Sequence, residues 1–476
     1  MLGLFGTLNL GARSMSTQRA GVEVAGQNLA NVNNPAYARQ RVNIATSITI
    51  SSEIGPMGTG AEAVAIQQMR NALLDGQIQA EASNRGSLTS QQIALQYTQA
   101  ALGTQIDRMA TGAEGATAAQ GVGGGHSLAD SMSALFNAFQ SLSTNPTSMA
   151  ERQTLLMKAA SLALQFNQLD TRLNNLTNSL NATIDSEVNA ANQLLGDIAN
   201  LNKLITTAEV TSGGTANDLR DTRQARIEEL AKYVKLDITN GTGSALNISI
   251  GGVDMVTDNQ VADTLQSYDA GGGQMMLRAT TAGTPLTVTS GSIQGTIIAR
   301  DGAVADLQTN VNALATALIT EVNAIHASGF SLSGSTGANF FTGTDATNMG
   351  VNGALINDPT LLQAAGVSGA SGDNQTALAL AQLAQTKHAA FNNQTFNQAY
   401  GQNVAAFGQE LSTINSQLGD QEAIEDMLLR QRDSLGGVSL DEEMTDLTRF
   451  QKAFAASARL ITTVDEMLET LINMKR

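Results

Sequence analysis

The stretch SLALQFNQLDTRLNNLTNSLNATIDSEVNAANQLLGDIAN, residues 161–200, carries an apolar residue at every third or fourth position along its length. This spacing is typical of an amphipathic helix with one apolar stripe. The stripe shifts once, by a four-residue stutter between Leu180 and Ile184, and then continues. We predict a single helix over residues 151–209, on the order of 90 Å long. Because so long an apolar face needs partner helices, the stretch predicts a long helical bundle.

Three further segments carry the same pattern and supply those partners. Apolar residues recur at helical spacing from Leu88 to Met109, from Val304 to Ile325 and from Val404 to Leu428. An apolar seam inside a chain is more often core than an assembly contact, so we assign all three to the interior of the bundle.

The N-terminal segment is a weak helix with a regular seam. Its large apolar residues recur every seven positions, at Leu8, Met15, Val22 and Leu29. Three glycines, at positions 11, 21 and 26, lie within it, and each costs about 1 kcal/mol relative to alanine in a helix. We therefore expect this helix to require a partner.

The C-terminal segment offers that partner. Its seam has a strict spacing of three and four residues and consists of Leu447, Phe450, Phe454, Ser457, Ile461, Val464, Leu468 and Leu471. Ser439 and Glu442 match a capping box, and two glycines at 436–437 break the chain before it. We expect the two terminal segments to pair as a coiled coil that is mobile in a monomer and ordered in an assembly.

Residues 236–300 break the helical pattern. The run ALNISI, residues 245–250, alternates apolar and polar residues, and Gly, Thr and Asp punctuate the residues after it. We predict a mainly α fold: a terminal coiled coil from 1–35 plus 436–476, a helical bundle from 36–235 plus 301–435, and a small inserted β-rich domain at 236–300.

The composition excludes several classes of function. The net charge of −16 disfavours nucleic acid, whose phosphates require clusters of Lys and Arg. The absence of cysteine excludes disulfides and thiolate metal sites. No run of about eighteen apolar residues is present, which argues against a membrane span, and the N-terminus lacks the features of an ordinary signal peptide. Charged residues are only 14% of the chain, so the polar surface must depend on Asn, Gln, Ser and Thr.

No constellation for catalysis, cofactor or metal binding is visible. The three histidines, His126, His326 and His388, are far apart in sequence. We expect a loop or helix-entry residue for the first and C-terminal helix turns for the other two. The glycine-rich run at 121–127 lacks the lysine of a phosphate-binding loop. The acidic run at 441–443 is best interpreted as the first turn of a helix. We expect no enzyme activity, no cofactor and no metal site.

The run NLANVNNPAYARQR, residues 28–41, follows the N-terminal helix directly. Asparagine side chains compete for backbone groups and Pro35 cannot continue a helix, so both favour a turn here. The chain should then turn outward, away from the terminal helices. Tyr37 and Arg39 either brace this turn or are ordinary solvated loop residues.

This run resembles the N-terminal signature of the flagellar rod, hook and hook-associated protein family. The matching residues are Asn28, Leu29, Ala30, Asn31, Pro35, Tyr37, Arg39 and Gln40. Gln27, Asn34 and Ala36 depart from the pattern. Residues 217–234, 291–330, 340–352 and 434–474 are similar to the hook-associated members.

The resemblance implies a structural subunit of the bacterial flagellum at the junction of hook and filament. It also implies export through the flagellar type III apparatus, an extracellular position, and assembly as a ring of identical subunits through the terminal helices. The implied partners are hook protein, a second hook–filament junction protein and an export chaperone. A hook or distal rod protein of the same family, or a coiled-coil adhesin, remains the alternative.

Overall fold

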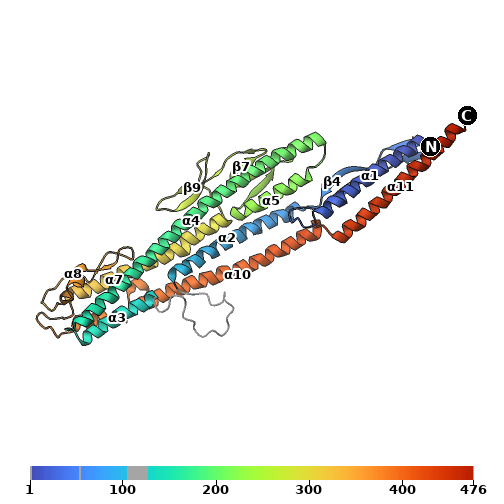
Figure 1. Ribbon diagram of the computed structural model, residues 1–476. Helices are drawn as coiled ribbons and strands as arrows, with labels where there is room; N and C mark the ends of the chain where they lie inside the picture. Colours follow the sequence, from blue (N-terminus) through green and yellow to red (C-terminus); the bar gives the residue numbers. More distant parts are fainter. Residues whose placement is uncertain (1–2, 53–54, 104–126, 475–476) are drawn as a thin grey trace.

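The protein is a long helical rod with both chain ends at one tip (Figure 1). The computed structural model describes residues 3–52, 55–103 and 127–474. The predicted mainly α fold is confirmed, with helices from the two chain ends packed together and small sheets added to a helical bundle. Met109 and His126 lie outside the described residues.

One helix runs through the whole bundle. The predicted helix at 151–209 is confirmed as α4, Met149–Ser212, which packs against helices on several sides. Its neighbours are α3 (Leu128–Thr144), α5 (Asn217–Tyr233), α6 (Ser292–Ala299) and α7 (Ala305–Ser328), with one π-helical turn, η1 (Arg300–Val304), joining the last two. The remaining helices of the bundle are α2 (Ala72–Leu102), α9 (Gln375–Gln382) and α10 (Phe396–Gly436).

Two apolar cores are stacked along α4. The first collects the half of α4 up to Leu180 with α3, α7, α9 and α10. The second begins at Ile184 and joins the rest of α4 to α5, α6 and the inserted strands. The division coincides with the stutter in the α4 seam, because the shift there turns the stripe toward different partners.

The inserted β structure lies between α5 and α6. Strands β5 (Asp237–Asn240), β6 (Leu246–Ile250), β7 (Val253–Thr257) and β8 (Gln260–Val261) form an antiparallel sheet in sequence order, and β9 (Leu265–Asp269) pairs with β10 (Met275–Ala279) as a hairpin. Residues 292–300, which the prediction placed in this insert, are helical.

Asparagine side chains of α4 fasten these strands. Asn192 Nδ2 donates to Leu265 O, and Leu265 N–H donates to Asn192 Oδ1, both at 2.8 Å. Asn202 forms the same pair with Leu246, at 2.8 and 3.3 Å. Because an amide side chain has the donor and acceptor of a peptide group, each Asn bonds to the first residue of its strand as a neighbouring strand would.

The far end of the bundle is closed by a long loop that contains short elements. These are β11 (Phe341–Thr342), β12 (Gly350–Val351), α8 (Gly353–Asn357) and η2 (Pro359–Leu361). Arg152 is buried and donates to Pro146 O, Pro359 O and Leu362 O, which ties the α3–α4 turn to this loop.

The two histidines in the described chain differ from their predicted roles. His326 lies in the last turn of α7 as expected, but it is fully buried, with Ala338 O on Nδ1 at 2.7 Å and the Gln363 N–H on Nε2 at 3.0 Å. Burial lowers its pKa to about 4, so it is neutral and gains nothing from the helix dipole. His388 lies outside any α-helix, before η3 (Ala389–Phe391), with its ring on Phe396.

The segment after the signature turn is β structure, which corrects its assignment to the helical bundle. Strand β1 (Gln40–Thr46) pairs with β4 (Ala61–Gln68), and β2 (Thr49–Ser52) pairs with β3 (Gly55–Gly58). The β1–β4 pair, here called the ribbon, packs on the N-terminal helix α1 (Leu4–Ala30). The chain therefore returns along α1 and does not turn away from it (Figure 1).

The C-terminal helix α11 (Leu440–Asn473) lies antiparallel beside α1 (Figure 1). Gly436 and Gly437 end α10, as predicted, and the acidic run at 441–443 forms the first turn of α11. The predicted capping box is wrong. Ser439 occupies the N-cap position without a side-chain cap bond, and Glu442 binds Arg39 instead.

Candidate assembly surface and signature turn

The glycines of α1 allow α1 and α11 to approach closely. A Cβ atom on Gly11 would lie 2.8 Å from Ile461 Cγ1, and one on Gly21 would lie 2.6 Å from Phe450 Cδ1. Between them the Ser14 and Ser457 hydroxyls are 2.7 Å apart. The contact line of α1 thus consists of small residues, and two of the glycines predicted to be a penalty are required for it.

The predicted seam of large residues on α1 flanks this line. Leu8, Met15, Val22 and Leu29 are half-buried, whereas Val24 and Ala25 are buried. On α11 only Val464 of the predicted seam is buried. The half-buried members are Leu447, Phe450, Phe454, Ser457, Ile461 and Leu468, and Leu471 is 60% exposed. The terminal pair therefore leaves its own seam partly open to solvent.

Asn28, the first residue of the signature turn, is 1% exposed and uses its whole side-chain amide. Nδ2 donates to Gln40 O at 2.9 Å and to Glu443 Oε2 at 3.0 Å. Oδ1 accepts from the Tyr37 hydroxyl at 2.8 Å and from Gln40 N–H at 3.0 Å. One side chain thus joins the end of α1, the turn, the start of the ribbon and the first turn of α11.

The turn itself is built from the asparagines and the proline. Asn31 Nδ2 donates to Gln27 O and holds the last turn of α1, while Asn34 Oδ1 accepts from the Ala36 N–H. Pro35 lies between Asn34 and Ala36, in the turn, where a residue without a backbone N–H is tolerated. The local structure follows directly from these residue types.

Tyr37 and Arg39 both make specific contacts. Burial, with the nearby carboxylates of Asp218, Asp221 and Glu443, raises the pKa of Tyr37, so its hydroxyl remains the donor to Asn28. Arg39 Nη1 lies 2.7 Å from Glu442 Oε2, and its Nε lies 2.7 Å from Glu443 Oε1. Burial lowers the pKa of Arg39, but the two glutamates outweigh it and raise the pKa overall.

The backbone at Arg39 joins three elements. Its N–H donates to Gly436 O at the end of α10, and its carbonyl accepts from Met69 N–H after β4. A Cβ atom on Gly436 would lie 2.3 Å from Met69 O, so the chain passes here only because position 436 is glycine.

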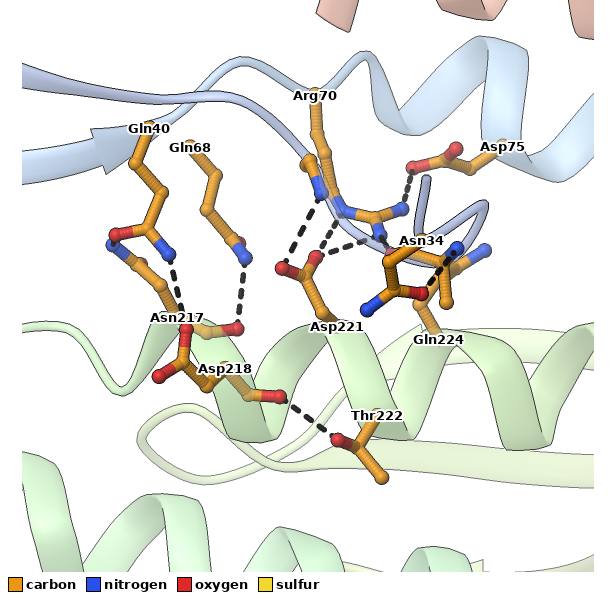
Figure 2. A network of polar contacts seen from close by, with 12 residues as sticks. Asn34, Gln40, Gln68, Arg70, Asp75, Asn217, Asp218, Asp221, Thr222 and Gln224 are labelled. Atoms are coloured by element: carbon orange, nitrogen blue, oxygen red, sulfur yellow. Dashed lines mark hydrogen bonds and ion pairs between the residues drawn. The ribbon is translucent and has the colours of Figure 1, made fainter. Parts of the chain in front are cut away.

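A second polar network fixes the turn to the bundle (Figure 2). Arg70 lies beside Asp221 of α5, with 2.7 Å between Arg70 Nη2 and Asp221 Oδ1, and the same Nη2 donates to Ala36 O. Asp221 Oδ2 accepts from Ala38 N–H at 3.3 Å. Burial raises the pKa of Asp221 although the Arg70 charge opposes the shift.

The ribbon is held by the same end of α5. Gln40 Nε2 donates to Asp218 Oδ1 at 3.1 Å, and Gln68 Nε2 donates to Asn217 O at 2.8 Å (Figure 2). No sequence pattern predicted the partners of the turn, which are Arg70, Asn217, Asp218 and Asp221. The only signal was the similarity of residues 217–234 to hook-associated proteins, which did not indicate what this helix binds.

The arrangement is suited to fixing elements in place. Within the ranges 3–52, 55–103 and 127–474 there is no group of three or more His, Asp or Glu placed to hold a metal ion. None of the helices in the described part of the chain has the length and apolarity needed to cross a membrane.

Comparisons with known proteins agree with this architecture. Residues 119–341 match the family model "Flagellar hook-associated protein FlgK helical domain", and residues 436–474 match "Flagellar basal body rod FlgEFG protein C-terminal". Flagellar hook-associated protein 1 of Bacillus subtilis (strain 168) is 25% identical over 520 residues, with 99% of each chain covered. That of Escherichia coli (strain K12) is 23% identical, with 98% of this chain and 99% of the relative covered.

A solved structure shares the fold. The flagellar hook junction protein FlgK from Burkholderia pseudomallei superposes with a TM-score of 0.62 at 15% identity, over 76% of this chain and 100% of that one. The helical-domain match and the nearly full-length relatives indicate hook-associated proteins, and the C-terminal helix also matches flagellar rod proteins. Over nearly its whole length, this chain is similar to flagellar hook-associated protein 1.

Proposed function

We propose that this chain, a structural protein of the flagellar hook–filament junction, assembles as a ring of identical subunits through its terminal helices. In this proposal it is a non-enzymatic subunit exported through the flagellar type III apparatus, and it acts outside the cell. Its neighbours are hook protein and a second junction protein, and an export chaperone is its partner before export.

The partly open seam of the terminal pair is the observation that carries the proposal. Val464 is the single predicted seam residue of α11 that is buried, and Leu471 is 60% exposed. Burying a large apolar side chain contributes about 1.5–3 kcal/mol, so copies that cover the remaining surface gain substantial free energy. The absence of cysteine and tryptophan suits a chain that passes unfolded through a narrow channel.

Deletion of residues 440–476 tests the proposal. The truncated chain should keep the cooperative thermal unfolding of the bundle, because the bundle has its own cores, and should fail to join hook tips. Incorporation of the truncated chain at hook tips, observed by electron microscopy, would contradict the proposal. Leu468→Asp in the full-length chain, which should also fail to join hook tips, is the control for a general effect of shortening the chain.

The alternatives make different predictions. A hook or distal rod protein would extend the hook or rod in place of a ring at its tip. A coiled-coil adhesin would function without joining a flagellum. The long α4 and the family match over 119–341 support the junction protein.

A further inference from the structure

A polar pocket of about 420 Å³ lies where the ribbon, α2 and α5 meet, and is here called the arginine pocket. Three arginines line it, Arg70 after β4 and Arg220 and Arg223 of α5, together with Gln67 of β4 and Asp75 of α2. Part of this region is drawn in Figure 2, with Arg70 and Asp75 beside α5. Because nearly all the lining side chains are polar, a ligand of this pocket must be polar or charged.

Two of the three arginines bind a carboxylate with the same edge of the guanidinium. That edge carries Nε and Nη2, which form a fork suited to the two oxygens of a carboxylate. Arg70 Nε and Nη2 lie 3.1 and 2.7 Å from Asp221 Oδ1. Arg220 Nε lies 2.7 Å from Glu209 Oε1, and its Nη2 lies 2.9 Å from Glu209 Oε2.

Arg223 leaves this edge free. Its Nη1 donates to Asn202 Oδ1 and to Ser244 O, both at 2.7 Å, which fixes the side chain in place. Neither its Nε nor its Nη2 has a hydrogen-bond acceptor among the described residues. The residue is only 6% exposed, yet neither of these two nitrogens is sealed from solvent. A buried guanidinium with an unused edge lacks part of the hydrogen bonding that such groups require.

The charge of Arg223 is also incompletely balanced. In the described chain Arg220 and Arg223 share one carboxylate, Glu209, and it is bonded to Arg220. Burial and then the Arg220 charge lower the pKa of Arg223 to about 10, while Glu209 opposes the shift. The carboxylate that lines the pocket, Asp75, lies 3.4 Å from Arg70 Nη1. At neutral pH the pocket therefore presents a positive guanidinium that another negative group would stabilise.

We propose that the arginine pocket binds a carboxylate group, held by Nε and Nη2 of Arg223. Gln67, which is exposed at the pocket and makes no side-chain hydrogen bond in the described chain, supplies a further donor. The carboxylate is either that of a small free acid or that of an Asp or Glu side chain on a neighbouring protein. Copies of this chain offer many such side chains, because it has 42 acidic residues against 26 basic ones.

Acetate binding to the purified monomer tests the site itself, and this test does not depend on the function proposed above. Acetate is titrated at constant ionic strength, with chloride as the control anion, and the arginine Nε–H signals are followed by ¹⁵N NMR. The Arg223 signal, identified by its loss in Arg223→Lys, should shift saturably with acetate and not with chloride. No shift, or equal shifts with both anions, would overturn the proposal.

A charge placed at the pocket gives a second test that leaves Arg223 and its contacts unchanged. Gln67→Glu should abolish the acetate response, because its carboxylate repels or replaces the ligand. Gln153→Glu, the same change at an exposed position of α4 outside the pocket, is the matched control and should respond like the unmodified chain. An undiminished response in Gln67→Glu would also overturn the proposal.

The same two variants distinguish the sources of the carboxylate, in an experiment that rests on the proposed function. If a neighbouring protein supplies it, Gln67→Glu should join hook tips less often than Gln153→Glu, as counted by electron microscopy. If the ligand is a free acid, the two variants should join equally, while only Gln67→Glu loses acetate binding. Failure of the unmodified chain to join hook tips would refute the proposed function and leave the acetate result standing.

Discussion

The bundle and the terminal pair use the same apolar spacing and bury it to different extents. Phe166, Leu173 and Leu195 of α4 have no exposed surface, whereas Leu8 and Leu447 at comparable positions of the terminal seams are half-buried. The difference is the number of neighbours. Helix α4 has helices and strands on several sides, while α1 packs mainly on α11 and the ribbon. Regular apolar spacing indicates that one face of a helix is buried, but it does not show whether the covering surface belongs to the same chain or to another copy.

The strongest contrast should appear in amide hydrogen exchange of the dilute monomer. Amides of α4 should exchange only through global unfolding, because both cores must open, whereas α1 and α11 should open locally and exchange much faster. Mass spectrometry of peptides from each helix measures this. Equal protection of the terminal helices and α4 would remove the distinction between the two regions.

Substitutions in the two seams should separate stability from assembly. Phe166→Ala creates a cavity in a closed core and should cost about 3–5 kcal/mol of unfolding free energy. Leu468→Asp, on the half-buried seam, should prevent assembly at hook tips and leave the unfolding of the bundle nearly unchanged. Denaturant unfolding and electron microscopy of hook tips measure the two effects. Loss of bundle stability with Leu468→Asp would make the terminal pair part of the folded unit.

The bundle should weaken in mild acid through His326. Its pKa is about 4 in the folded state and about 6.5 when unfolded, so between these values only the unfolded chain takes up the proton. Stability is therefore lost as pH falls through this range, by about 2 kcal/mol from pH 7 to pH 5. Denaturant titrations at the two pH values test this. His326→Gln is the control, since it should lose this component of the pH dependence; an identical dependence would exclude His326 as its source.

The smallest expected effect is a difference in stability of α1 between alanine substitutions at two of its glycines. Gly26 has nothing within 4 Å of an added Cβ, so Gly26→Ala should stabilise α1 by up to about 1 kcal/mol. Gly21→Ala places the same atom against the Phe450 ring and should separate α1 from α11 despite the same gain in helix propensity. Amide hydrogen exchange of α1 in each variant shows whether the substitution stabilises or destabilises the helix. If both variants protect α1 equally, Phe450 moves freely and the close approach is unimportant.

The prediction from sequence succeeded where the pattern was long and local. Helix α4 extends over many turns of one apolar stripe, so its limits were close to 151–209. The turn at 28–41 was predicted because asparagine and proline act on their immediate neighbours. The predicted capping box was wrong because the Glu442 side chain forms an ion pair with Arg39, about four hundred residues earlier in the chain.

The prediction failed where contacts were distant and polar. The strands of the ribbon are rich in Ala and Gln, so their alternation of apolar and polar residues was too weak to detect. The bond between Arg70 and Asp221 joins ordinary charged residues that no spacing relates. The asparagine pairs with the first residues of β1, β6 and β9 were equally hidden, because an Asn on a helix has no sequence pattern that identifies its partner.

The amino-acid sequence alone determined the long helices, the weakness of α1, the polar turn after it and the absence of cysteine chemistry, because each depends on residues close together in the chain or on composition. Only the tertiary structure decided that Gly11 and Gly21 admit α11 and that α5 holds the signature turn. Those features arise where segments distant in sequence meet, and their geometry depends on how every element between them packs.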